Sequence, residues 1–542
     1  MTDKHSREDL LALKDLDQTD REKLVAAVGR GLSRRDMLTV LGAAGVTAAS
    51  AGHLFSAAGE AYAATPKKGG SVRFASDLHG PSDTLDPQLF TSTIDYSRGR
   101  ALYSSLTQFR DSIVPQPELA EEFESNADVT EWTFKLRKNV KFHDGTPLTA
   151  DDVIWSLSRH TMEGSKSKAK TLVSGVKEWK KLDSHTVKAV MDAPNADLPA
   201  ILATFHFKIL KKDTTDFQNP VGSGPYRLKE FKPGVRSVHM RNDDYWRDAA
   251  NFDEIQIFAI TDSVARTNAM MAGDIHMMQA LDPKQVKQVE KNKNVRVIST
   301  QSGAYIGICC MLNASPGNNW DFVQGMKALP RRKRVVRSIL KKQGTVGNDH
   351  PINVAYGPDF CDELPVREHD LDKAKFHFKK SGISSAELNV AEVAPGVTDM
   401  CLTVQRDAQK AGLDLQVKKV PNDGYWGAVW MKTPLNVVTW NMRPTANIML
   451  TLAFAPDAPW NDTLWKNARF GKILKEVRGV TDDAKRHEMY CELQRLAHEG
   501  SGMVIPAHRN YVDATAASIR GIPTVPLGAL GGCEFPEFAW QA

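Results

Sequence analysis

Residues 221–246 read VGSGPYRLKEFKPGVRSVHMRNDDYW, and this stretch decides where the rest of the chain can be placed. The GSG of residues 222–224 forms a turn that only small residues allow, and Pro225 fixes φ directly after it. The run YRLKEF predicts a strand, KPG a second turn, and VRSVHMRN the returning strand, so the local unit is a hairpin. The stretch contains no nucleophile–base pair, phosphate loop or metal-ligand spacing.

The same stretch carries an ordered set of motifs. GSGPY, KPG and NDDYW resemble the signature of the family 5 solute-binding proteins of ABC importers, the peptide- and nickel-binding type, in which G-[ST]-G-P-[YF], a turn and N-x-x-Y-W recur together. The string FHDGTPLTADDVIWSL at 142–157 and the AGDI that ends a predicted helix at 272–275 resemble the same family. The resemblance covers nearly the whole chain after residue 63. It departs from the family at Gly325 and at 330–331, where an apolar residue followed by Asp is usual.

The N-terminal region resembles a twin-arginine export signal. Arg34 and Arg35 stand in the string SRRDML, residues 37–59 contain no Lys, Arg, Asp or Glu, and Ala63 closes an A-x-A site. The apolar run is too weak for a comfortable membrane span. We therefore predict a Tat signal peptide at 1–63, cleaved near Ala63, a periplasmic address, and the Tat translocase as a partner. An uncleaved N-terminal anchor is the alternative.

Composition and charge favour an exported soluble protein. The chain has 542 residues and a formal net charge of +5, an excess too small and too dispersed to indicate nucleic-acid binding. No later segment approaches the ~20 apolar residues of a spanning helix. The densest basic run, RRKR at 331–334, lies on an amphipathic helical pattern. We interpret it as a solvated face of that helix, in preference to a binding patch.

Neither the cysteines nor the histidines form a recognisable metal or catalytic pattern. None of the six cysteines belongs to a C-x-x-C pair, so zinc or iron–sulfur ligation is not expected, and no cofactor is predicted. One or two disulfides are permitted in the periplasm, with open connectivity; for Cys401 and Cys491, on helical patterns, buried thiols are preferred. His143 and Asp144 lie at a predicted hairpin tip without a second ligand, so a catalytic or metal-binding role is not expected.

The resemblance implies an α/β fold with two lobes: the two-lobed periplasmic binding protein fold of type II, cluster C. We expect lobe one at 66–302 plus 507–542, with an extra subdomain near 114–184, and lobe two at 303–506. Two strand crossovers near Gly303 and Ile505 would act as hinges. A chain of this length is expected to split into at least two lobes on size alone.

The implied function is that of a periplasmic substrate-binding protein. It would capture a small solute, peptide-like or carboxylate-bearing, and deliver it to the transmembrane subunits of an ABC permease. It would not be an enzyme. The alternatives are a hydrolase or redox enzyme exported with its cofactor, which no G-x-S-x-G, H-E-x-x-H, G-x-G-x-x-G or C-x-x-C-H motif supports, and an adhesin or chaperone-like protein on the same scaffold.

The ligand is constrained by two segments that differ from the dipeptide-binding members of the family. Those members hold the peptide amine with an Asp after a buried W-x-G strand, whereas residues 440–447 here contain no acid; they hold the carboxylate with an Arg in a loop where 393–399 here contain none. Arg443 places a cation where those proteins place an anion, which favours an acidic solute. Internal pairing of Arg443 with Asp457 or Glu476 is the alternative.

Aromatic residues crowd the second half of the chain. For any single tryptophan a core position is favoured, but as a group two or three of the five are expected to line the ligand pocket; the five are Trp426, Trp430, Trp440, Trp460 and Trp465. The predicted ligand-binding residues are Tyr103, Gly303, Tyr305, Tyr425, Trp426, Trp440 and Arg443.

Overall fold

In the computed structural model, the described residues are 24, 54, 66–422 and 425–542. The chain divides into two units, residues 1–69 with 518–520 and 540–542, and residues 70–517 with 521–539. In the smaller unit, β20 (Ile519–Arg520) pairs with β21 (Trp540–Gln541). The large sheets belong to the other unit.

The predicted export signal cannot be compared with this structure. Arg34, Arg35 and the cleavage site near Ala63 lie outside the described residues. Within the described part of the chain, no helix has the length and apolar character needed to cross a membrane.

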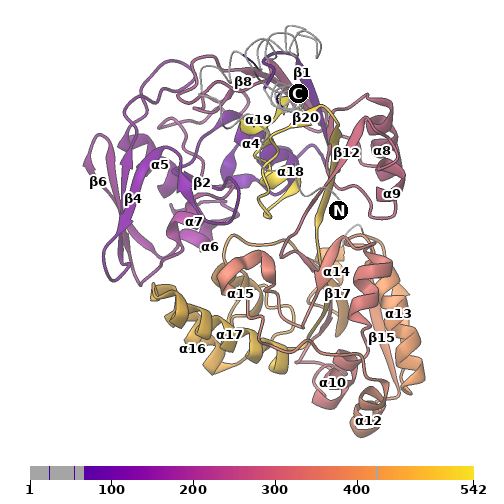
Figure 1. The fold of residues 1–542 in the computed structure, drawn as a ribbon. Coiled ribbons are helices and arrows are strands. Elements are labelled where there is room, and N and C mark those ends of the chain that lie inside the picture. Colours follow the sequence, from indigo (N-terminus) through magenta and orange to yellow (C-terminus); the bar gives the residue numbers. More distant parts are fainter. Residues whose placement is uncertain (1–23, 25–53, 55–65, 423–424) are drawn as a thin grey trace, which may run out of the picture. The chain divides into compact units, whose positions relative to one another are not determined.

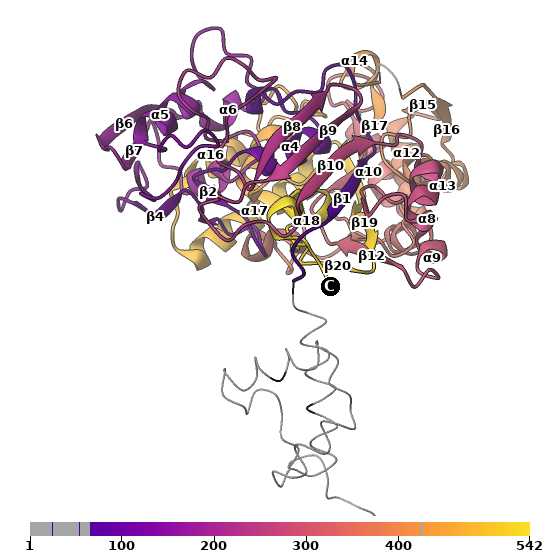
Figure 2. The same cartoon turned by 90° about the horizontal axis from the view of Figure 1, so that it is seen from above.

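The first large sheet is mixed and has seven strands (Figure 1), in the spatial order β12 (Val295–Thr300), β19 (Tyr511–Ala516), β11 (Met277–Met278), β1 (Ser71–Ser76), β10 (Glu254–Ala259), β9 (Arg236–Arg241) and β8 (Tyr226–Lys232). Strand β1 runs parallel to β10 and β11, whereas β19 and β9 pair antiparallel with their neighbours. Helix α4 (Thr93–Leu102) packs on β8 and β10, as Figure 2 shows. Helices α8 (Ser263–Ala272) and α9 (Val286–Val289) contact β11 and β12.

The predicted hairpin at 221–246 is confirmed. Strands β8 and β9 are antiparallel, with Tyr226 opposite Arg241 and Lys232 opposite Arg236. The KPG turn needs its glycine for conformation, because Gly234 has a φ of 70°. The GSG turn needs its glycines for space: a Cβ on Gly222 would lie 1.9 Å from the carbonyl oxygen of Leu102, at the end of α4.

His143 ties together two of the motifs that carried the resemblance. Its Nδ1 accepts from the N–H of Gly222 at 3.3 Å, and its Nε2 lies 3.1 Å from the carbonyl oxygen of Gly224. Because that oxygen only accepts, the ring is the neutral Nε2–H tautomer; burial lowers the pKa of His143 to about 4. The histidine therefore holds the GSG turn in place.

A smaller antiparallel sheet has four strands, in the order β4 (Ala120–Ser125), β5 (Glu131–Leu136), β7 (Thr186–Met191) and β6 (Val176–Asp183). Helices α5 (Ala150–Ser158), α6 (Lys170–Val173) and α7 (Leu198–Leu202) accompany it. Helix α5 begins as predicted at Thr149, whose N–H donates to the Asp152 carboxylate at 2.8 Å. Strand β7 lies after residue 184, the expected end of the subdomain. It belongs to this sheet nevertheless, because it pairs with both β5 and β6.

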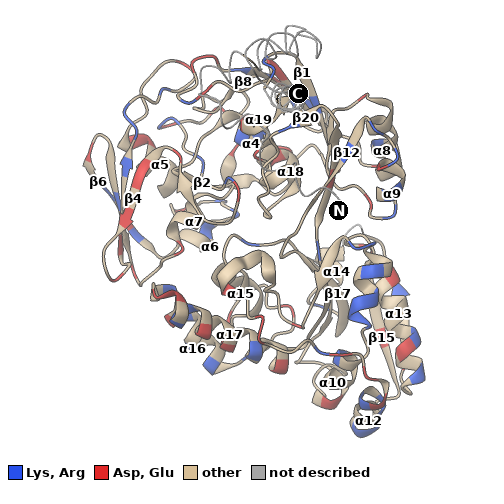
Figure 3. Ribbon diagram, viewed as in Figure 1, with Lys and Arg blue, Asp and Glu red and all other residues tan. Residues whose placement is uncertain are grey.

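The second large sheet has six strands, in the order β14 (Gly344–Val346), β18 (Met503–Arg509), β13 (Tyr305–Cys310), β17 (Leu435–Trp440), β15 (Ser385–Val390) and β16 (Asp414–Lys419). The longer helices in this part of the chain are α10 (Trp320–Ala328), α12 (Leu371–Ser381), α13 (Val397–Lys410), α15 (Ala446–Phe454), α16 (Ala468–Glu476) and α17 (Asp483–Gly500). Figure 3 shows basic and acidic residues interspersed along α13 and α16.

Strand β13 shows why this sheet is buried on both faces. Ile306 and Ile308 join the hydrophobic core that includes residues of α10, α12 and α13, whereas Tyr305 and Cys309 join the core that includes residues of α15, α16 and α17. Successive strand residues point to opposite faces, so a strand covered on both sides must be apolar throughout. The run YIGICC meets that requirement.

The chain passes between the two large sheets twice. It leaves β12 at Thr300 and enters β13 at Tyr305, and it leaves β18 at Arg509 and enters β19 at Tyr511. The first passage contains Gly303, the predicted crossover. The second passage lies after residue 506, the expected end of lobe two. The chain stays in β18, paired with β14, up to Arg509, which lies opposite Gly344.

The cysteine predictions hold for one residue and fail for another. Cys401 is a buried free thiol in α13, as expected. Cys491 is not a free thiol: it forms a disulfide with Cys361, 130 residues away, joining α17 to the segment that follows the short helix η4 (Val354–Asp359). The prediction was wrong because helical periodicity places Cys491 on a face of α17 without indicating which loop covers that face.

The basic run at 331–334 is only partly a solvated face. Lys333 is exposed and pairs with Glu368, but Arg332 is 3% exposed and donates two hydrogen bonds to the fully buried Asp349. Arg367 donates to the same carboxylate at 2.9 Å. The predicted helix is also interrupted, as α11 (Arg332–Arg334) runs into a π-helical turn over Val335–Ile339.

Candidate ligand-binding site

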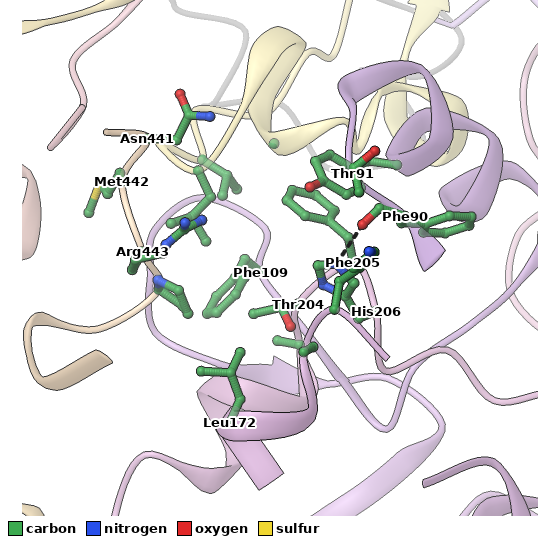
Figure 4. A pocket seen from close by; sticks show the side chains of 18 of the residues that line it. Phe90, Thr91, Phe109, Leu172, Thr204, Phe205, His206, Asn441, Met442 and Arg443 are labelled. Atoms are coloured by element: carbon green, nitrogen blue, oxygen red, sulfur yellow. Dashed lines mark hydrogen bonds between the residues drawn. The ribbon is translucent and has the colours of Figure 1, made fainter. Parts of the chain in front are cut away.

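A cavity of about 370 Å³ lies where segments of all three sheet systems meet. Its walls come from the start of α4 and the loop before it, from residues 168–172 and 203–206 beside the four-stranded sheet, and from residues 441–444 after β17. The segment 525–534 near the C-terminus, together with Phe109, Leu452 and Trp460, completes it. Figure 4 shows the side chains of 18 lining residues, ten of them labelled.

One wall is aromatic. The rings of Tyr96 and Phe205 stack with centroids 4.2 Å apart and an interplanar angle of 13°. His206 meets Tyr96 edge-on at 5.8 Å, and its Nε2 lies 3.0 Å from the carbonyl oxygen of Phe90, the dashed line in Figure 4. Burial lowers the pKa of His206 to about 4, so this ring is neutral at pH 7 and contributes no charge to the cavity.

Arg443 lies on the facing segment, in the turn after β17. Its backbone N–H donates to the Tyr356 hydroxyl at 3.3 Å, and its guanidinium carbon lies 5.5 Å from the centroid of Trp440. Its Nε is buried without a hydrogen-bond partner among the residues that the structure describes. Neither internal partner considered above is used: Arg443 pairs with no acidic side chain in the described part of the chain, and Glu476 instead lies 3.9 Å from Lys472.

Trp440 is held under Arg443 by a buried carboxylate. Asp462 accepts from the indole N–H of Trp440 at 2.8 Å and from that of Trp430 at 2.6 Å. Burial raises the pKa of Asp462 to about 7, although the two indole bonds oppose the shift. The carboxylate fixes both indoles and does not line the cavity.

At the cavity floor, Arg100 pairs with Glu534 at 2.7 Å, and both side chains are at most 5% exposed. Lys208 and Glu118 lie close by in the interior, and neither the Lys208 ammonium nor one Glu118 oxygen has a hydrogen-bond partner among the described residues. Burial lowers the pKa of Lys208 to about 7 and raises that of Glu534 to about 7. Glu534 is the only acidic side chain among the described lining residues.

Of the seven predicted ligand-binding residues, Arg443 alone is among the lining residues that the structure describes. The hydroxyls of Tyr103 and Tyr425 are buried and donate to the carbonyls of Leu85 and Val437. These two side chains therefore tie one backbone segment to another. Ligand contact by them stays a prediction.

The other four predicted residues are likewise not among the described residues that line the cavity. Tyr305 is fully buried in β13, and a Cβ on Gly303 would lie 2.5 Å from the Tyr356 ring. Trp440 is 6% exposed, whereas Trp426 is 45% exposed and packs edge-on against Trp430. Of the five tryptophans, Trp460 alone is among the lining residues, where two or three were expected.

The aromatic wall was missed at the sequence level. No sequence motif marks its residues Phe90, Tyr96, Phe205 and His206. The run TFHF at 204–207, which contains two of them, has the composition of ordinary core. Glu534, in the C-terminal segment, likewise has no local signal that pairs it with Arg100.

Comparison with known proteins identifies the family. The model of bacterial extracellular solute-binding proteins, family 5, matches residues 114–459, and the chain belongs to this family. The dipeptide-binding protein of Escherichia coli (strain K12) is 24% identical over 498 residues, covering 83% of this chain and 91% of that protein.

Solved structures give the same fold. The periplasmic binding protein DppA from Helicobacter pylori, in complex with the peptide STSA, matches with a TM-score of 0.74 and 21% identity, covering 88% of this chain and 98% of that one. NikZ from Campylobacter jejuni, in complex with Ni(L-His), matches with a TM-score of 0.76 and 18% identity, covering 87% and 99%. These neighbours are type II periplasmic binding proteins, so the predicted fold is confirmed.

The protein is therefore a substrate-binding component of an ABC import system, and its family is one of substrate-binding proteins rather than of enzymes. The two structures hold different kinds of ligand on one fold. The solute must consequently be argued from the side chains of this cavity.

Proposed function

We propose that this protein captures a small peptide-like or carboxylate-bearing solute in the cavity beside Arg443 and delivers it to the transmembrane subunits of its permease. The relatives support the peptide-like part of this range, since one is named for binding dipeptides and one was solved with a tetrapeptide. The side chains of the cavity support the carboxylate.

The observation that carries the proposal is the unpaired charge of Arg443. Its guanidinium lines the cavity, its Nε lacks a partner, and the one described carboxylate of the lining is already paired with Arg100. A partly buried cation without a counter-ion is unfavourable, and a ligand carboxylate would remove that cost. Arginine also presents a planar fork that matches a carboxylate in two hydrogen bonds.

Native mass spectrometry of the protein purified without denaturation tests this proposal by weighing any co-purified solute. Thermal-shift screening of the wild type against dipeptides, amino-acid derivatives and organic acids then ranks ligands. Arg443→Ala should lose the shift, whereas Arg334→Ala, at an exposed position away from the cavity, should keep it. A cationic dipeptide that stabilises wild type and Arg443→Ala equally would refute the role of Arg443.

We also propose that the two expected lobes, 66–302 plus 507–542 and 303–506 with the second boundary moved to the end of β18 at Arg509, close on the solute about the two passages between the large sheets. Contacts that join segments on either side of the cavity support this. Thr445 donates to Asp197 at 2.9 Å, and Arg486 lies 3.3 Å from the same carboxylate. Ligand contacts from both lobes would favour the closed form over the open one.

For export, we propose the Tat route with cleavage near Ala63 and a periplasmic location. The twin arginines of the N-terminal region and the extracellular character of the family support it.

A further inference from the structure

We propose that the solute is an anion with an aromatic or similarly flat apolar body and without a free ammonium group. N-acylated aromatic amino acids and aryl-substituted carboxylic acids belong to this class. The inference rests on the proposed function, since it assigns chemistry to the same cavity. It excludes the free, zwitterionic dipeptides that the proposed function alone would permit.

The charges of the lining lead to the first half of the inference. Its described cations are Arg100, Lys168 and Arg443, and its one described carboxylate is that of Glu534. Glu534 is already ion-paired with Arg100 at 2.7 Å, and burial raises its pKa to about 7, so it offers little negative charge to a ligand at pH 7. Lys168 is exposed, and its ammonium forms no ion pair with an acidic side chain within the described part of the chain. Two cations therefore remain uncompensated, Arg443 and Lys168.

An ammonium group on the solute would find no free counter-ion among the described lining residues. It would lose water in a cavity whose free charges are positive, and the one carboxylate in reach is 2% exposed and held by Arg100. Desolvating a cation beside like charges without a counter-ion is unfavourable. His206 supplies no counter-charge, because burial lowers its pKa and the ring is neutral at pH 7, with its Nε2–H donating to the carbonyl oxygen of Phe90.

The aromatic residues lead to the second half. Phe90, Tyr96, Phe109 and Phe205 line the cavity from the lobe-one side, and Trp460 lines it from the other. Trp460 is 42% exposed, although it packs against Trp440 at 6.1 Å. A flat ring placed among these side chains would remove apolar surface from water on both sides.

Size and placement agree with one ring system and one carboxylate. The cavity of about 370 Å³ lies at the small end of the roughly 300–1,000 Å³ range of ligand pockets. In Figure 4, Arg443 lies on one side and Phe90, Phe205 and His206 on the other, with Phe109 between them. A solute that spans this distance would direct its carboxylate to Arg443 and its ring to the aromatic wall.

Isothermal titration calorimetry with four phenylalanine derivatives tests the inference, because the ring is constant and only the charges change. The probes are N-acetyl-phenylalanine (anion), N-acetyl-phenylalaninamide (neutral), phenylalaninamide (cation) and glycyl-phenylalanine (zwitterion). N-acetylglycine tests the need for the ring. We expect N-acetyl-phenylalanine to bind at least tenfold more tightly than each of the other four.

Variants locate the binding. Arg443→Gln should weaken N-acetyl-phenylalanine at least tenfold, and Lys168→Gln should weaken it less, because Lys168 is more exposed. Trp460→Leu should weaken N-acetyl-phenylalanine but leave N-acetylglycine unchanged. Arg334→Gln is the matched control and should bind like the wild type.

Several results would overturn the inference. They are a cationic or zwitterionic probe that binds as tightly as the anion, an Arg443→Gln variant with unchanged affinity, or no binding by any probe. In each of these cases a co-purified solute of another class, detected by native mass spectrometry, would leave the proposed function intact. A protein that carries no solute and binds nothing across peptides and organic acids would refute the proposed function itself.

Discussion

Replacing Asp349 by Asn should destabilise the protein strongly, because this carboxylate is the counter-ion of a buried cationic cluster. Asp349 is fully buried and accepts from Arg332 at 2.7 and 2.8 Å, from Arg367 at 2.9 Å and from the N–H of Ile505 in β18 at 2.9 Å. Lys327 is also fully buried and acts electrostatically on the same carboxylate. The side chain thus joins α11 to the strand that leads back to the other sheet.

The magnitude follows from what the substitution leaves behind. Asparagine can still accept from Ile505, but Arg332 and Lys327 would remain buried with no negative charge beside them. Removing one partner of a buried ion pair costs about 3–5 kcal/mol of unfolding free energy. Glu368→Gln is the matched control: it breaks the Lys333–Glu368 pair, whose side chains are 79% and 71% exposed, and should cost at most about 1 kcal/mol.

The pH dependence gives a second signature. Burial alone would raise the pKa of Asp349, but Arg332, Lys327 and Arg367 outweigh it and hold the pKa below its ordinary value of 3.8. The carboxylate therefore stabilises the fold at pH values above 3.8, and this contribution is lost as the pH falls through the lower, folded value.

Urea unfolding followed by tryptophan fluorescence, at pH 7 and at several pH values below 4, measures both effects. The difference between wild type and Asp349→Asn should be large at pH 7 and should narrow in acid. A variant within about 1 kcal/mol of the wild type at pH 7, or a gap that persists unchanged in acid, would refute the reasoning.

Four further predictions follow from other features. The double variant Cys361→Ser, Cys491→Ser should lose about 2–5 kcal/mol of stability, because the disulfide closes a loop of 130 residues. If wild type and double variant unfolded at the same denaturant concentration, this prediction would be contradicted. The raised pKa of Asp462 means that its stabilising contribution is complete below pH 3.8 and is lost as the pH rises through about 7. The melting temperature of Asp462→Asn should consequently decline less between pH 5 and pH 8 than that of the wild type, and equal declines would count against it. Changing Arg34 and Arg35 together to Lys should leave precursor in the cytoplasm on cell fractionation, because paired guanidinium groups are read by the Tat receptor; an unchanged periplasmic yield would exclude this route. Small-angle scattering should show a smaller radius of gyration with bound solute, and tight binding without contraction would rule out closure.

Local chemistry made part of the fold predictable. The hairpin at 221–246 and the start of α5 at Thr149 depend on residues within a few positions of one another: a φ that glycine supplies at Gly234, and an acidic residue three positions after the cap. In β13, likewise, the unbroken apolar run YIGICC is what burial on both faces requires. Such features are determined by the sequence because the interacting groups are close in the chain.

Motif order made the family and its fold predictable, and the comparisons confirm both. Arg443 was also predicted from position alone, as a cation where related proteins place an acid, and the structure places it at the cavity. The other predicted ligand-binding residues are aromatic or lie near a crossover. A tyrosine such as Tyr103 has the same sequence signature whether its ring faces a solute or, as here, its hydroxyl donates to a buried carbonyl.

What only the tertiary structure decided are pairings between distant segments. Cys491 forms a disulfide with Cys361, 130 residues away. Arg332 donates to the buried Asp349, and Glu534 near the C-terminus forms an ion pair with Arg100 in α4. The sequence by itself determined that these residues exist and which local elements carry them. It could not determine their partners, because an ion pair, a disulfide or a cavity wall depends on distances in space, and those are set by how the sheets pack rather than by separation along the chain.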